Sequence, residues 1–596
     1  MTTARSLRAA FGQLTLRQRL VGLFFFALVV RAIYLFEISG SPFFRTLVGD
    51  AAFYDAWAVD IQHDWLGKEI FYQAPLYPYA LAGIYWVAGH DTLVVRLVQI
   101  VLGASACVLL AAGGRSFVSR RAAWIAGLLL ALYAPAIFFD GLVQKPSLDL
   151  FFVTALVFLL GRIQDGSGGT GTAFVAGIAV GCLSLTRENA LVLIPVLSAW
   201  LVWINRPGNL QGGAARSAAT TGGLFAARLV GPLLVGSSMI LAPVALRNYC
   251  VGHELVLTTS QFGANFYVGN NEMADGLYEP LVWAHGSYPE EHRDAIELAE
   301  RAAGRHLSPR EVSTYWAALA WQWIREHPMD WLRLMGKKWL LVWNAREIAD
   351  SDEPLVYRDA SSVMKGLGSL LVFGVVCPLA AVGIAAQRRQ WRRLVVLYLI
   401  AAGIACSTAL FFVFARYRFP MVPILLLLAG SALDDLVQRL RSKERRPLVV
   451  YAVVLVVASV VVWLPLPAGT DESPRATAYY NLAVSFEAQG AADSAMTTYR
   501  AAIANQPDFA QAHANLGALL ARSGQFDAAI SEERSALAVS PDDPIAHTNL
   551  ANVLLVIGHL DEAEVHYRAA LGAEPNLASA RQGLFAVGMA RRDLGK

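Results

Sequence analysis

Long apolar runs dominate the first 465 residues of the chain and constrain its fold more than any other feature. A helix that crosses a bilayer needs roughly 17–25 mostly apolar residues, and its backbone must satisfy its own hydrogen bonds. The residues therefore predict an all-α, polytopic membrane bundle over residues 1–465. The eleven predicted spans are 20–36, 92–113, 122–138, 147–162, 172–186, 190–204, 229–246, 366–386, 394–414, 419–433 and 447–464.

The composition supports this division and excludes several functions. The chain is 56% apolar and 16% charged, whereas a soluble domain averages about 45–50% apolar and about 25% charged. Residues 475–596, by contrast, read as an ordinary soluble helical domain. The net charge of +3 is small for this length and does not indicate nucleic acid as a partner, whereas the apolar runs predict membrane lipid as one. The five cysteines show no CxxC spacing, so we expect no metal site and no disulfide framework.

The charges of the loops predict the topology. Four arginines precede the first apolar run and no small-residue cleavage site follows it, so we expect a retained first span that enters from the cytoplasm. With this order, the predicted cytoplasmic pieces hold 19 Lys and Arg, and the predicted short outer loops hold 6. Loops 37–91 and 247–365 are then extracytoplasmic, as is everything after residue 464. Within the first of these loops, Pro75–Gly89 is too short to span and should lie at the membrane surface.

The C-terminal part repeats with a period of 34 residues. Small alanines allow two helices to approach closely, and a proline ends each unit. This spacing and pattern are typical of tetratricopeptide repeats, so we expect an α-solenoid over residues 474–596 with a partial unit from Ala578. Its concave face should bind a protein or peptide, although a structural spacer would show the same pattern. The repeated positions are Asn481, Asn515, Asn549; Leu482, Leu516, Leu550; Gly490, Gly524, Gly558; and Pro507, Pro541, Pro575.

One acid and several cations fall at the predicted outer boundary of the bundle. Asp50 follows the first span, with Tyr54 one helical turn later, near the depth of a lipid headgroup. A single aspartate there could also cap a short helix. The cations are unexpected outside the cytoplasm; arginine holds phosphate in a bidentate way, whereas snorkelling toward headgroups would be the plainer role. These cations are Lys145, Arg187, Arg247, Arg416 and Arg418.

On the predicted outer side, the sequence contains in order Leu47–Trp57, Gln73–Tyr79, Asp140–Pro146, Thr186–Asn189, Arg247–Asn248 with Gly263–Asn270, and Ala415–Pro420. Together these stretches resemble membrane glycosyltransferases of the GT-C fold, in particular bacterial relatives of the protein O-mannosyltransferases and aminoarabinose transferases. The resemblance covers about residues 15–465. One departure is Ala51, because many relatives have Asp-Glu where this chain has Asp50-Ala51. A role with two carboxylates or a metal is therefore in doubt.

The resemblance implies transfer of a sugar from a polyprenyl-phosphate-linked donor to a hydroxyl group of a protein or glycan, which the repeats could recruit. Asp50 would act as the catalytic base. Tyr54 and the five cations would bind the donor, whose anionic leaving group needs positive charge. Inversion is the expected stereochemistry, and a bacterial inner membrane with extracytoplasmic repeats is the expected location. No cofactor is expected beyond the lipid-linked donor.

Three other functions remain open. An O-antigen ligase or polymerase would also be polytopic, a transporter would show two similar halves, and a non-enzymatic anchor could present the repeats. Two further side chains, His285 and Tyr288, could contact the sugar. Arg31 lies inside the first span and is expected to pair with a buried carboxylate such as that of Asp149.

Overall fold

The computed structural model describes residues 15–205, 222–282, 288–348, 352–466 and 473–594, and each regular element within these ranges is a helix. The fold is all-α, as predicted. The chain divides into two compact units, and each is described by itself. The first contains residues 1–41, 49–350 and 357–468, and the second contains residues 42–48, 351–356 and 469–596.

Each of the eleven stretches predicted as spans falls on a helix. Within the described residues, seven helical segments are long and apolar enough to cross a membrane. Three shorter apolar helices and one bent pair match the remaining predictions; the number of spans itself stays a prediction. The seven are α2 (Leu16–Ile38), α6 (Thr92–Gly114), α9 (Pro146–Gln164), α13 (Gly222–Gly252), α21 (Trp391–Leu410), α22 to α23 (Ala415–Ser442) and α24 (Arg445–Val462). The others are α7 (Arg120–Leu132) with α8 (Ala134–Asp140), α10 (Thr170–Thr186), η1 to α11 (Glu188–Ile204) and α20 (Phe373–Ala386).

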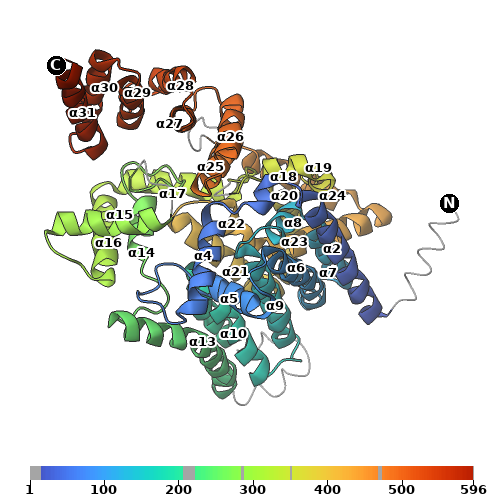
Figure 1. Ribbon diagram of the computed structural model, residues 1–596. Helices are drawn as coiled ribbons and strands as arrows, with labels where there is room; N and C mark the ends of the chain where they lie inside the picture. The colour runs from blue at the N-terminus through green and yellow to red at the C-terminus, as the bar shows by residue number, and fades with distance from the viewer. Residues whose placement is uncertain (1–14, 206–221, 283–287, 349–351, 467–472, 595–596) are drawn as a thin grey trace. The chain divides into compact units, whose positions relative to one another are not determined.

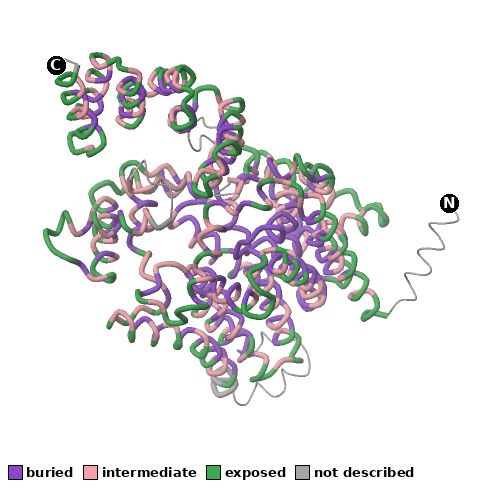
Figure 2. Tube along the Cα trace, viewed as in Figure 1, coloured by how far each residue is buried: buried purple, intermediate pink, exposed green. Residues whose placement is uncertain are grey.

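Glycines let neighbouring helices of the bundle approach closely. Helices α10 and α13 pack along each other (Figure 1). A Cβ atom on Gly177 would lie 2.1 Å from the carbonyl oxygen of Leu233, and one on Gly236 would lie 2.1 Å from that of Phe174. Such small residues are the usual means by which membrane helices pack backbone to backbone. Figure 2 shows the result, with buried residues where the helices meet and exposed residues on their outward faces.

Arg31 has a different partner from the one expected. Its Nε donates to Oδ2 of Asp140 at 2.6 Å, and both side chains are almost fully buried. Asp149 instead binds Arg187. Because Gly103 lacks a side chain, this ion pair can lie directly against α6. Arg31 therefore joins α2 to α8, and the expected Arg31–Asp149 pair is not formed.

Short helices connect the long ones on the side of the bundle that carries Asp50. Two of them, α4 (Gly49–His63) and α5 (Leu76–Ala88), lie between α2 and α6. The long segment after α13 folds mainly into four helices, and apolar residues of the first three pack together around Trp316. These are α14 (Phe262–Gly269), α15 (Tyr288–Ala303), α16 (Pro309–Glu326) and α17 (Pro328–Trp343), and the shorter α18 (Pro354–Ala360) and α19 (Ser362–Leu367) follow them.

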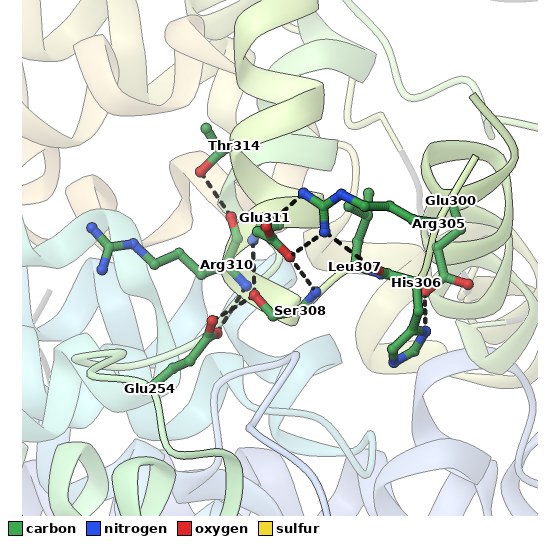
Figure 3. A network of polar contacts seen from close by, with 9 residues as sticks. All are labelled: Glu254, Glu300, Arg305, His306, Leu307, Ser308, Arg310, Glu311 and Thr314. Atoms are coloured by element: carbon green, nitrogen blue, oxygen red, sulfur yellow. Dashed lines mark hydrogen bonds and ion pairs between the residues drawn. The ribbon is translucent and has the colours of Figure 1, made fainter. Parts of the chain in front are cut away.

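A polar network fixes the start of α16 (Figure 3). Ser308 accepts a hydrogen bond from the backbone of Glu311, whose carboxylate accepts one in return from the backbone of Ser308, which makes a capping box. Arg305 adds an ion pair to Glu311 at 2.7 Å. The carboxylate of Glu254, just beyond α13, accepts from the Ser308 hydroxyl and from the backbone N–H of Arg310. The end of α13 is thus tied to α16.

The second unit contains three helix pairs and one further helix, as the repeat pattern predicts. The glycine in each inter-helix turn has a positive φ, between 74° and 86°, which explains why glycine recurs there. The repeated alanines at 495, 529 and 563 are fully buried between the helices. The helices are α25 (Pro474–Ala488), α26 (Ala492–Asn505), α27 (Ala510–Arg522), α28 (Phe526–Val539), α29 (Pro544–Val556), α30 (Leu560–Ala573) and α31 (Ala578–Leu594).

Candidate active site

Four separate segments of the first unit bring polar side chains together at the ends of the long helices. Asp50 and Tyr54 lie on α4, and Lys145 immediately precedes α9. Arg187 lies between α10 and η1, and Arg416 lies on α22 (Ala415–Arg418). We call these five residues the polar cluster. They are far apart in the chain and meet because their helices end on the same side of the bundle.

Asp50 lies in the first turn of α4 and forms an ion pair with Arg416 through its Oδ2 and the arginine Nη1. The two side chains are only 14% and 9% exposed. Burial alone would raise the pKa of Asp50, but the charge and hydrogen bond of Arg416, with the charge of Lys145, outweigh it and lower that pKa. Asp50 is therefore held as a carboxylate in contact with a cation.

Tyr54 and Lys145 lie next to each other in the polar cluster. The Tyr54 hydroxyl donates to Oε1 of Gln73 at 3.0 Å, and Nζ of Lys145 lies 5.8 Å from the centroid of the Tyr54 ring. Burial raises the pKa of Tyr54 well above its usual value, so the phenol stays protonated. Burial lowers the pKa of Lys145, against the opposing charge of Glu188. A buried lysine of this kind gains strongly from an anionic ligand.

Arg187 is oriented by one partner and retains a nitrogen without one. Its Nε binds Oδ2 of the fully buried Asp149 at 2.5 Å. Its guanidinium carbon lies 5.3 Å from the centroid of the Tyr417 ring, the same distance as that of Arg416. Within the described part of the chain, Nη2 of Arg187 is buried without a hydrogen-bond partner. Such a buried, unsatisfied donor is costly unless a ligand takes it.

Glu188 also belongs to this site, although the sequence reasoning did not select it. Its Oε1 accepts from the Thr259 hydroxyl at 3.2 Å and from Gln261 Nε2 at 2.8 Å. Its charge acts on both Lys145 and Tyr54. A second carboxylate is thus present from another loop. In the sequence, its position next to Arg187 in the same predicted outer turn could have identified Glu188 as a residue of the site. In the described ranges, no group of three or more His, Cys, Asp or Glu side chains could hold a metal ion.

Two of the predicted donor-binding arginines contact backbone carbonyls elsewhere. Arg247 donates to the carbonyl oxygens of Leu66 and Glu69, and its guanidinium lies 3.8 Å from the ring centroid of Phe71. Arg418, 1% exposed, donates to several carbonyl oxygens at the end of α17. Both guanidinium groups hold loops in place, and neither has a contact with the polar cluster among the described interactions.

The matching stretches contain two further carboxylates, Asp55 and Asp140, and each has a partner outside the polar cluster. Asp140 is buried in its pair with Arg31. Asp55 accepts from Tyr85 and pairs with a ring nitrogen of His90. His285 lies outside the described residues, as does the side chain of Tyr288.

An apolar groove of about 670 Å³ runs between α11 and α13. Its volume is in the range of ligand-binding sites. Leu257, one of its lining residues, is two positions from Thr259, which bonds Glu188. Ile194, a second lining residue, lies six residues after Glu188 on the helical segment Glu188–Ile204. Two lining residues of the groove are therefore close in sequence to Glu188 and to its partner Thr259.

Two parts of the chain match known protein families. Residues 72–234 match the family described as dolichyl-phosphate-mannose-protein mannosyltransferase. Residues 468–508, 480–544 and 520–585 match tetratricopeptide repeat families. No match was found among curated proteins.

Solved structures that are similar to this chain include three membrane enzymes. ArnT from Cupriavidus metallidurans, bound to undecaprenyl phosphate, is 16% identical and has a TM-score of 0.40, with 95% of this chain and 77% of that chain covered. AglB from Archaeoglobus fulgidus, with an inhibitory peptide and a dolichol-phosphate, is 14% identical with a TM-score of 0.41, covering 78% and 57%. The Pmt1-Pmt2 complex of S. cerevisiae, bound to the sugar donor, is 17% identical with a TM-score of 0.31, covering 44% and 38%.

This chain thus spans less than two thirds of the archaeal and yeast chains. Residues 72–234 are thus similar to the dolichyl-phosphate-mannose-protein mannosyltransferase family, and tetratricopeptide repeats follow in the C-terminal part of the chain.

Proposed function

We propose that this integral membrane protein transfers a sugar from a polyprenyl-phosphate-linked donor to a hydroxyl group of a protein or glycan on the extracytoplasmic side. The observation that supports this best is the buried, unpartnered Nη2 of Arg187 beside Tyr417. With Lys145 and Arg416 in the same polar cluster, it offers an anion three cationic side chains. A phosphate is the anion that arginine holds best.

The apolar groove supports a lipid-linked donor in particular. A polyprenyl chain needs an apolar surface within the membrane, and the groove is lined mainly by leucine, isoleucine and alanine side chains of α11, α13 and the following loop. Since its lining segment reaches the residues that bond Glu188, a lipid in the groove could place its phosphate at the polar cluster.

The polar cluster also has the groups that the transfer needs. Asp50 takes the proton of the acceptor hydroxyl as that oxygen attacks the anomeric carbon. The leaving polyprenyl phosphate is negatively charged, and Lys145, Arg187 and Arg416 stabilise this charge as the bond between the phosphate oxygen and the anomeric carbon breaks. One base and direct displacement predict inversion at the anomeric carbon. The ring of Tyr54, which is buried and protonated, lies 5.8 Å from Nζ of Lys145 and helps to position that ammonium group.

Two substitutions separate these roles. Asp50→Asn keeps the shape of the side chain but cannot accept a proton, so we expect sugar transfer to fall by about 10²–10⁴-fold while polyprenyl phosphate still binds. Arg187→Ala should instead weaken binding of the lipid phosphate. Transfer of radiolabelled sugar in membranes and binding to the purified protein measure the two effects. Near-normal transfer by Asp50→Asn would remove Asp50 as the base, and no effect from either change would refute the proposed function.

A further inference from the structure

Each of the two arginines of the polar cluster pairs with a carboxylate, and the two pairs differ in geometry. Arg187 contacts Asp149 through Nε, on the inner side of its guanidinium, and its outer Nη2 remains available. Arg416 contacts Asp50 through the outer nitrogen Nη1. Arg187 can therefore add a phosphate without losing its carboxylate. Arg416 presents to Asp50 the terminal nitrogen that a phosphate would also take.

The pair between Asp50 and Arg416 conflicts with the role of Asp50 as a base. A carboxylate in contact with a guanidinium is a weak base, because protonation would break the ion pair. The pKa of Asp50 reflects this, since Arg416 and Lys145 lower it despite burial. General-base catalysis is most effective when the pKa of the base lies near the working pH. Asp50 paired with Arg416 is thus poorly suited to proton transfer.

We propose that the donor phosphate draws Arg416 away from Asp50 and so makes Asp50 basic only when the donor is bound. The proposal rests on the proposed function of the same site. A phosphate can bind a guanidinium in a bidentate way, and it would compete with Asp50 for Nη1 of Arg416. Lys145 and Arg187 hold the phosphate from other segments, so the exchange is local to Arg416. The acceptor proton then moves to a carboxylate that has lost its principal cation.

This exchange makes opposite predictions for the two carboxylates. Asp50 competes with the phosphate for Arg416, so removing its charge should tighten phosphate binding. Asp149 orients Arg187 without competing for Nη2, so removing its charge should weaken binding. If both pairs were only structural, both substitutions would weaken binding.

The test measures the affinity of the full-length protein for undecaprenyl phosphate in lipid nanodiscs. Asp50→Asn should bind about three- to tenfold more tightly, which corresponds to about 0.7–1.4 kcal/mol. Asp149→Asn should bind several-fold more weakly. In a background of Arg416→Gln, the effect of Asp50→Asn should vanish, because the group for which Asp50 competes is gone.

Each outcome decides one question. Unchanged or weaker binding by Asp50→Asn overturns the exchange, as does a tightening that persists in the Arg416→Gln background. No binding of undecaprenyl phosphate by the wild-type protein overturns the proposed function instead. Thermal unfolding checks that each variant folds. If Asp149→Asn does not fold, the cycle of Asp50 and Arg416 variants decides alone.

Discussion

The carboxyl group of Glu533, in the repeats, is buried and predicts that the stability of this unit depends on pH. Its side chain is fully buried, and a Cβ on Gly517 would lie 2.7 Å from its Oε1, so the carboxyl group fills the space left by that glycine. Burial raises its pKa from 4.5 to about 9. Between these values the folded protein keeps a proton that the unfolded chain releases. The stability that this group contributes is therefore full below pH 4.5 and is lost as pH rises to 9.

Glu533→Gln should remove this pH dependence, because an amide has the shape of the protonated acid but does not titrate. Denaturant unfolding of residues 473–596 at pH 5, 7 and 8.5 measures it, and the wild-type fragment should be least stable at pH 8.5. The exposed Glu574→Gln is the control and should follow the wild type. An equal pH slope in wild type and Glu533→Gln would contradict the assignment.

Single residues of the site differed in how well the sequence predicted them. The alternation of loops placed Asp50, Lys145, Arg187 and Arg416 on one side of the bundle, and the structure gathers them into one cluster in which Asp50 contacts Arg416. Their catalytic and binding roles stay predictions. The contacts of Arg418 depend on which carbonyls a distant helix presents, and no spacing in the sequence reports that. The same holds for Arg31, because the way in which the helices align decides between Asp140 at the end of α8 and Asp149 in the first turn of α9.

At the scale of elements, α17 depends on Arg418. This arginine donates to the carbonyl oxygens of Leu341, Val342 and Asn344, at the end where a helix lacks intrahelical donors. At the same time it lies two residues from Arg416. The contact therefore couples the position of α17 to the turn that carries an arginine of the polar cluster.

Arg418→Gln should free the end of α17 and cost about 1–3 kcal/mol of local stability, because several buried carbonyl groups lose their donor. We expect faster hydrogen exchange over residues 328–343. Sugar transfer should fall more than undecaprenyl phosphate affinity does, since Arg187 and Lys145 remain in place. Arg333→Ala on the same helix removes an exposed pair with Asp330 and should change exchange little. A loss of affinity as large as that of Arg187→Ala would instead indicate direct donor binding by Arg418.

The elements themselves were largely predictable, because helix formation depends on local apolar pattern. The departures have local causes. The stretch predicted as 122–138 is bent by 53° between α7 and α8, where Pro135 lies in the first turn of α8 and cannot continue the hydrogen-bond ladder of α7. The stretch predicted to begin at 366 becomes α20 from Phe373, since a separate short helix, α19, ends at Leu367.

At the scale of the whole molecule, the side of the membrane on which each part lies follows from the number of spans. An odd number places the two ends of the chain on opposite sides, and the loop charges orient the first span. The side on which Asp50 lies depends only on the orientation of the first span, whereas the side on which the repeats lie depends on all eleven predicted spans. One span more or fewer would move the repeats to the cytoplasm and leave the first outer loop where it is.

Reporter fusions at four points therefore separate orientation from span number. We expect a periplasm-dependent reporter to be active when it is fused after residues 45, 470 and 596, and inactive after residue 210, which lies in a predicted cytoplasmic loop. Activity after 45 but not after 470 and 596 would show that one predicted span is wrong. The site would then be extracytoplasmic without the repeats, so the repeats could not present an acceptor to it. Inactivity after 45 would reverse the whole bundle and place the polar cluster on the cytoplasmic face.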